Sequence, residues 1–173
     1  METEQPFTGT GAFAFGEWRT PFENEALNIC EIAYSSVFGS AGASGGNTES
    51  SLLRRVPEHQ LTVRIAVETT GDVYRLMFQQ VSAFRVLDEH GLMEFWGETT
   101  RQGGRPAQST FRVRNHGWTK ESMLSFLPTD GWSYVVATDF DCVEIVSANP
   151  PLVILEPGGE PDESGKTRGP HAT

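Results

Sequence analysis

The sequence predicts an α+β domain rich in strands, either a mostly antiparallel sheet or a β-sandwich, with one or two short helices. Two strand pairs joined by turns carry this prediction, one over residues 61–78 and one over 132–146. The pattern lacks the long crossover helices that connect parallel strands in doubly wound α/β folds. The length of 173 residues suits one domain with a hydrophobic core. We expect that domain to span residues 25–156.

The first 24 residues place aromatic side chains between glycines and prolines. This composition predicts a partly ordered segment that packs on the domain, with a short edge strand at Phe13–Phe15. Residues 27–38 fit both helical and strand periods, and their Ile, Tyr, Val and Phe content favours a strand. Residues 39–51 are rich in Gly, Ser and Ala and predict a flexible loop. The loop lacks the Gly-Lys-Ser/Thr ending of a phosphate-binding loop.

The first hairpin has the clearest pattern in the chain. Apolar residues alternate with others from Leu61 to Val67, as in a half-buried strand. A turn at 69–72 leads into a returning strand that begins near Tyr74. The strand-like run 81–87 can continue this strand through a bulge near Gln79 and Gln80.

Asp88 is a candidate N-cap for a short helix over residues 89–96, which would turn Leu92, Phe95 and Trp96 inward. Residues 97–108 contain two adjacent glycines and a proline, which predict a loop.

A strand at 111–113 and a turn at 115–117 follow. A helical turn over 119–127 would then place Met123, Leu124 and Leu127 inward.

The second hairpin pairs residues 132–137 with 142–146 through a four-residue connection. A last strand is expected at 152–155. Residues 157–173 contain mainly Gly, Pro and charged residues and predict a disordered tail.

The net charge is −10, which argues against a nucleic-acid-binding protein because such proteins present a basic face. Residues 26–155 hold 14 acidic and 10 basic residues, a balance of −4, and the ends carry the remainder. No run approaches the roughly 20 apolar residues of a membrane span. The acidic N-terminus has no secretory pattern, so we expect a cytoplasmic protein with Cys30 and Cys142 as buried thiols.

Catalytic patterns are weak. Cys142, His116 and Asp139 or Asp141 have no spacing that requires a nucleophile set, since Cys142 lies in an apolar strand and His116 in a turn that is expected to be exposed. Spacings typical of metal sites are absent, and turn chemistry accounts for the pair of aspartates. We therefore expect no catalytic residues, no metal and no cofactor.

Acidic residues gather in two local clusters, which predict surfaces for a basic protein partner. The candidate residues are Asp88, Glu89, Glu94 and Glu98 in the first cluster, and Asp130, Asp139, Asp141 and Glu144 in the second.

Four segments carry a resemblance to a known class of protein: Phe84–Glu89, Gly91–Trp96, Trp132–Thr138 and Cys142–Ser147. Together they resemble small bacterial families that are similar to the immunity proteins encoded beside polymorphic toxins. The resemblance implies a non-enzymatic inhibitor that binds a toxin domain, and the acidic balance suits a basic toxin.

Two other classes stay open. One is a small ligand-binding or hydrolytic domain with a cleft lined by Trp96, Trp118 and Trp132. The other is a structural or assembly subunit. The sequence does not determine the oligomeric state.

Overall fold

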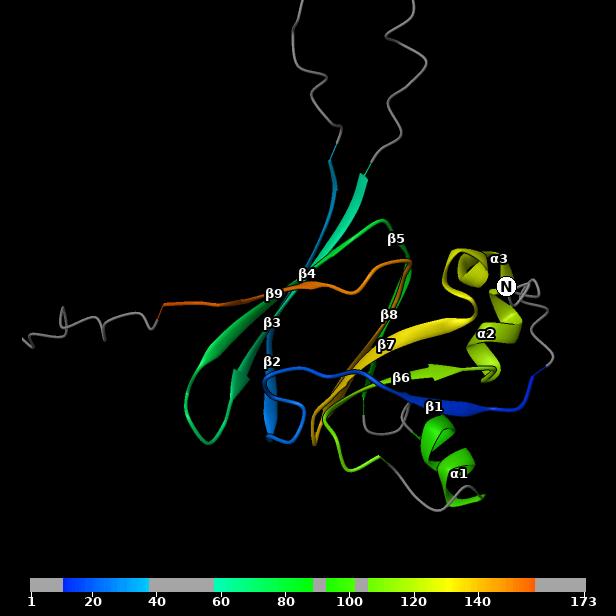
Figure 1. Ribbon diagram of the computed structural model, residues 1–173, viewed down its shortest axis with the longest axis horizontal. Helices are drawn as coiled ribbons and strands as arrows, with labels where there is room; N and C mark the ends of the chain where they lie inside the picture. Colours follow the sequence, from blue (N-terminus) through cyan, green and yellow to red (C-terminus); the bar gives the residue numbers. More distant parts are fainter. Residues whose placement is uncertain (1–10, 38–57, 89–92, 102–105, 158–173) are drawn as a thin grey trace, which may run out of the picture.

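The computed structural model describes residues 11–37, 58–88, 93–101 and 106–157. These residues form two antiparallel sheets and short helices, which confirms the predicted strand-rich α+β class. Figure 1 shows the two sheets crossing, with the helices beside only one of them. The loop predicted at 39–51, and the tail from residue 158 onward, lie outside the described residues.

The four-stranded sheet has the order β2-β3-β4-β9. Its strands are β2 (Leu27–Val37), β3 (Glu58–Val67), β4 (Val73–Gln79) and β9 (Leu152–Leu155). The β3–β4 hairpin is confirmed, and Gly71 adopts a positive φ of 75° in its turn. Residues 27–37 are a strand, as their residue content predicts.

The five-stranded sheet has the order β1-β6-β7-β8-β5. Its strands are β1 (Ala14–Glu17), β6 (Thr110–Arg114), β7 (Trp132–Ala137), β8 (Asp141–Ser147) and β5 (Val81–Asp88). β7 and β8 form the second predicted hairpin. The N-terminal β1 is an edge strand that pairs with β6.

The chain changes sheets between β4 and β5. Gln80 has a positive φ of 55°, and Val81 then pairs with Ser147 in the five-stranded sheet. The irregularity at Gln79 and Gln80 was predicted, but the following strand does not extend β4. The left-handed residue redirects the chain instead.

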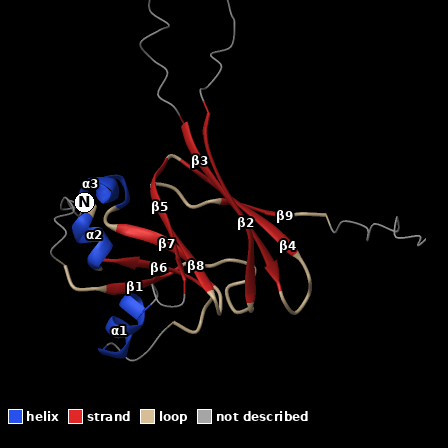
Figure 2. Ribbon diagram, turned by 180° about the vertical axis from the view of Figure 1, so that it is seen from behind, coloured by secondary structure: helices blue, strands red, loops and turns tan. Residues whose placement is uncertain are grey.

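Two hydrophobic layers hold the sheets and helices together. The larger core lies between the sheets and includes Trp18, Phe78 and Ile145. The smaller core lies on the other face of the five-stranded sheet and includes Phe95 and Val135. Figure 2 shows the helices gathered on that side, away from the four-stranded sheet. The order of layers is therefore four-stranded sheet, five-stranded sheet, helices.

The first helix lies later in the chain than predicted. α1 spans Met93–Arg101, whereas β5 continues to Asp88 and residues 89–92 are outside the described part. The prediction of a loop from residue 97 is therefore wrong for its first five residues. Phe95 is buried, as expected.

The second helical region consists of α2 (Gly117–Glu121), α3 (Met123–Phe126) and the 3-10 turn η1 (Leu127–Thr129). The predicted inward stripe is wrong, because Leu124 is 79% exposed and Met123 and Leu127 are also exposed. Ser122 breaks the helix with φ −119° and ψ 37°, which shifts the buried position to Phe126.

Within the described ranges, no helix is long and apolar enough to cross a membrane. Cys142 is buried in β8, but Cys30 is exposed in β2, so the prediction of two buried thiols is wrong for Cys30. Cys30 lies where the β2–β3 register shifts between Ile29 and Glu31. Such an irregularity in an edge strand changes the alternation that would otherwise place its side chains.

Candidate functional site

A buried acid, Glu144, is the centre of a polar cluster beneath the helices. Its side chain is fully buried, and its Oε2 accepts a hydrogen bond of 2.7 Å from Arg85 Nε. Arg85 Nη2 lies at 2.7 Å from the same oxygen, and His116 Nε2 lies 2.8 Å from Oε1. A buried charge requires such partners, because an unpaired carboxylate is strongly destabilising in an apolar layer.

Strand register brings Arg85 and Glu144 together. They are directly paired on β5 and β8, on the sheet face that the helices cover. The Arg85 guanidinium lies 4.6 Å from the Trp118 ring centroid and 5.5 Å from that of Phe95. These contacts shield the ion pair and add cation–π attraction.

Two hydroxyl groups complete the cluster. Ser133 Oγ donates to Glu144 Oε1 at 2.5 Å, and Thr119 Oγ1 lies 2.7 Å from His116 Nδ1. Thr119, His116 and Glu144 thus have the hydroxyl–imidazole–carboxylate order of a nucleophilic triad.

This triad-like cluster is closed to substrate. Thr119 and Glu144 have no exposed surface, and His116 is 4% exposed. The expectation that His116 is exposed is therefore wrong, since it precedes α2 as the N-cap residue and turns into the cluster. A nucleophile must touch its substrate, so these groups stabilise the sheet–helix interface rather than perform acyl transfer.

A second polar cluster lies on the outer face of the four-stranded sheet. Glu156 Oε2 lies 2.8 Å from Arg64 Nη2, and Glu156 Oε1 lies 2.5 Å from Arg75 Nη2. Hydrogen bonding with these arginines holds the pKa of Glu156 below its ordinary value, although partial desolvation opposes the shift. The cluster attaches the chain after β9 to β3 and β4.

Three of the eight predicted acidic residues, all exposed, lie together at one end of the five-stranded sheet. Asp88 and Asp141 are direct cross-strand partners on β5 and β8. Asp139 and Phe140 lie in the turn that precedes β8, and Phe140 is 70% exposed. We call Asp88, Asp139, Phe140 and Asp141 the acidic edge.

Two other predicted partner-binding residues, Asp130 and Glu144, lie away from the acidic edge. Asp130 precedes β7, at the opposite end of that strand from the acidic edge. Glu144 is buried and already paired, so its placement on an exposed acidic surface is corrected. Glu94 and Glu98 belong to α1, with side chains outside the described set, and Glu89 lies outside the described residues.

The three tryptophans proposed to line one cleft are divided between the two faces of the five-stranded sheet. Trp96 packs against the smaller core on the helical side. Trp118 contacts His116 and Phe126 in the helical layer. Trp132 alternates with Ser133 along β7 and therefore lies on the opposite face of the sheet from the polar cluster. These positions remove the basis for a shared tryptophan cleft.

A pocket of about 310 Å³ lies elsewhere, beside β1, and its lining includes Phe15, Trp18 and Phe111. In the part of the chain that the structure describes, no three His, Cys, Asp or Glu side chains form a group that could hold a metal ion.

Comparisons with protein-family models, with curated proteins and with solved structures give no match, so the assignment of function depends on the geometry of this chain.

Proposed function

We propose that the chain is a non-enzymatic cytoplasmic binding protein whose acidic edge recognises a basic protein domain. More specifically, we propose an immunity protein that neutralises a basic toxin. The carrying observation is the convergence of Asp88, Asp139 and Asp141 around exposed Phe140. Residues separated by about 50 positions in the chain meet there because β5 pairs with β8.

The acidic edge concentrates negative potential. Carboxylates at directly opposed antiparallel positions repel one another, which is destabilising. Arginine or lysine side chains of a partner would relieve this repulsion and speed encounter through electrostatic steering. This electrostatic complementarity supports a binding role for the acidic edge.

Phe140 supplies an apolar anchor within the charged surroundings. Aromatic residues are enriched among the residues that dominate interface energies. The Thr138 hydroxyl oxygen accepts hydrogen bonds from the backbone N–H groups of Phe140 (3.2 Å) and Asp141 (2.9 Å). The turn is therefore held in one conformation before a partner arrives, which lowers the entropic cost of binding.

The Thr119–His116–Glu144 cluster also agrees with a non-enzymatic role, because the groups that most resemble a catalytic set are buried. All three are packed within the fold, where they have a structural reason to be present. Among the predicted partner-binding acids whose side chains the structure describes, the exposed ones that lie together are those of the acidic edge.

Photo-crosslinking tests the proposed partner site. A photoreactive phenylalanine analogue replaces Phe140, and a matched variant carries it at Leu124, which is exposed on α3. We expect the Phe140 position alone to capture one basic protein in cells of the source organism. Capture from both positions equally, or of no defined protein at Phe140, would contradict the site.

Co-expression tests the immunity role. If the captured protein is toxic when expressed alone, this chain should restore growth, and the Asp139→Lys/Asp141→Lys variant should restore it less. A captured protein without toxicity would retain the binding role and reject the immunity role.

A further inference from the structure

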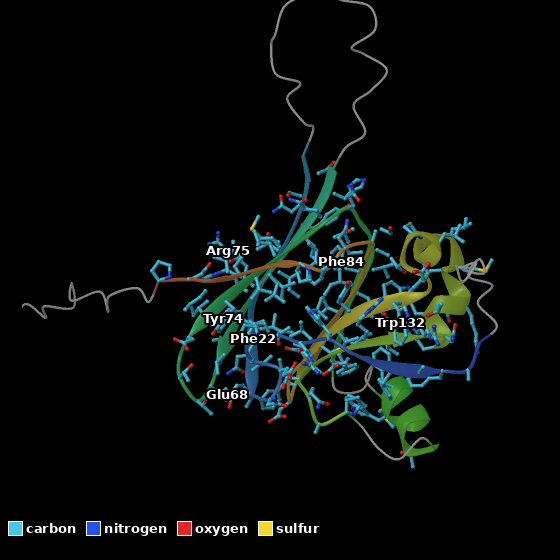
Figure 3. The ribbon with its side chains drawn as sticks, viewed as in Figure 1. Phe22, Glu68, Tyr74, Arg75, Phe84 and Trp132 are labelled. Atoms are coloured by element: carbon cyan, nitrogen blue, oxygen red, sulfur yellow. The ribbon has the colours of Figure 1, made fainter. Side chains whose placement is uncertain are left out.

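Two arginines contact one tryptophan on the face of the five-stranded sheet that is opposite the helices. Arg112 and Arg114 alternate on β6 with Phe111 and Val113, which are buried in the helical-side core. Their guanidinium carbons lie 4.9 Å and 4.7 Å from the Trp132 ring centroid. Figure 3 shows Trp132 on this sheet, across the molecule from Arg75.

Among the arginines whose side chains the structure describes, these two differ from the rest in having no carboxylate partner. Arg19, Arg64, Arg75 and Arg85 each lie within 4.0 Å of a glutamate oxygen. Over the described ranges, neither Arg112 nor Arg114 has an ion pair. Two neighbouring positive charges repel each other, and a cation–π contact with Trp132 brings no opposite formal charge to the pair.

Arg112 also has an unused buried donor. Its Nε is shielded from solvent, and the described residues provide no hydrogen-bond acceptor for it. A buried N–H without an acceptor is destabilising, so such groups usually indicate a missing partner. Burial raises the pKa of the adjacent Tyr134 hydroxyl, and the charge of Arg112 partly offsets that rise.

The Trp132 ring packs against β1. A Cβ atom added to Gly16 would lie 2.8 Å from one atom of the indole ring, so the ring packs directly on the glycine backbone. The indole thus orients both guanidinium groups, with Arg114 exposed and Arg112 partly exposed. A fixed pair of guanidinium groups is the usual recognition element for oxyanions.

We propose that Arg112, Arg114 and Trp132 form a binding site for an oxyanion, either a carboxylate or a phosphate group. The ligand's oxygens accept hydrogen bonds from the two guanidinium groups and compensate their charge. This site is separate from the acidic edge and has the opposite charge, so its ligand differs in chemistry from the proposed basic partner.

Nuclear magnetic resonance of the arginine Nε–H groups tests the proposal directly. The probes are inorganic phosphate and a capped tetraglutamate peptide, added at constant ionic strength, with a capped tetraglutamine peptide as the neutral control. Arg112→Lys and Arg114→Lys assign the two signals. We expect saturable shifts of both signals and a much smaller change at Arg75. Saturation by phosphate alone assigns a phosphate ligand, and saturation by the glutamate peptide assigns a carboxylate ligand.

Matched variants complete the test. Arg114→Gln should weaken binding at least about tenfold, because it removes one of two charge-assisted contacts. Arg75→Gln, on the other sheet, should change the affinity less than about twofold. Arg114 is exposed, so its replacement leaves the fold intact even where Arg112→Gln loosens the sheet. Equal affinity in the Arg114→Gln variant, equal shifts at Arg75, or no saturable shift with either probe would overturn the site.

Discussion

Arg85 and Glu144 face each other across β5 and β8, and Arg85 Nε donates a hydrogen bond of 2.7 Å to the Glu144 carboxylate. The pair lies between the five-stranded sheet and the helices, together with His116 and Ser133. This arrangement makes the charge of Glu144 a requirement of the fold rather than a surface feature.

Glu144→Gln should therefore destabilise the protein. The substitution preserves shape but removes the carboxylate charge that faces Arg85 and His116, and breaking a buried pair typically costs ~3–5 kcal/mol. Because 20% of the Arg85 side chain remains exposed, we expect a loss near the lower end of that range. Urea denaturation would measure it as a lower midpoint with an unchanged slope.

The control for this substitution is Asp139→Asn, which removes an exposed carboxylate from the turn before β8. It should change stability by less than about 0.5 kcal/mol. Equal stability of the Glu144→Gln variant and the wild-type protein would refute the structural role of the pair.

The register of α3 predicts a large difference between two neighbouring apolar residues. Phe126 is fully buried, whereas Leu124 is 79% exposed. Phe126→Ala should cost ~3–5 kcal/mol through lost burial and cavity formation. Leu124→Ala should change stability by less than about 0.5 kcal/mol. Thermal or urea unfolding of both variants measures the difference. A larger loss of stability in Leu124→Ala than in Phe126→Ala would contradict this register and support the inward Met123, Leu124 and Leu127 expected from the sequence.

Two glycines predict opposite effects of the same substitution. Gly16→Ala would force the Trp132 ring to shift, and such overpacking typically costs ~1–3 kcal/mol. Gly97 lies within α1, and an added Cβ would meet no atom within 4 Å. Gly97→Ala should therefore stabilise the protein by ~0.5–1 kcal/mol. Chemical denaturation measures the change in the free energy of unfolding for each variant. A stabilising Gly16→Ala would contradict the close packing of Trp132.

The lowered pKa of Glu156 predicts a pH-dependent contribution to stability. Arg64 and Arg75 hold the folded-state pKa below the unfolded value, so the folded state binds the proton less readily. The contribution of ionised Glu156 to stability is complete above the ordinary carboxyl pKa. It is lost as pH falls through the lowered folded-state pKa. The stability difference between wild type and Glu156→Gln should shrink over that window in a denaturation series. A difference that is constant through acid pH would reject the linkage.

The sequence was sufficient to predict the hairpins because side-chain alternation and turn residues act locally. Leu61 to Val67 show this in β3, since the apolar residues of the pattern are all buried. The change of sheets at Gln80 depends on a left-handed backbone residue, which a two-residue periodicity does not encode. The break at Ser122 likewise altered the helical register locally and moved the buried position to Phe126.

The candidate site was only partly predictable for a similar reason. The alternation in the sequence places Arg85 on one face with Val81, Ala83 and Leu87, so a charged residue among apolar ones was visible in the pattern. In the structure, a register shift between Val81 and Ala83 moves Val81 into the core between the sheets. Its pairing with Glu144 depends on β5–β8 register, a long-range property. The same register joins Asp88 to Asp141, which the sequence placed in separate clusters.

Affinity of the captured basic partner for charge-reversed variants tests the central proposal most directly. Binding of wild type, Asp139→Lys/Asp141→Lys and Glu121→Lys would be measured by calorimetry at low and at physiological salt. Glu121 is an exposed acid on α2 and is the matched control. We predict that the double reversal weakens binding about tenfold or more at low salt, that added salt narrows the difference, and that Glu121→Lys binds like wild type. Equal affinity of the double variant and wild type, or equal loss in Glu121→Lys, would contradict recognition through the acidic edge.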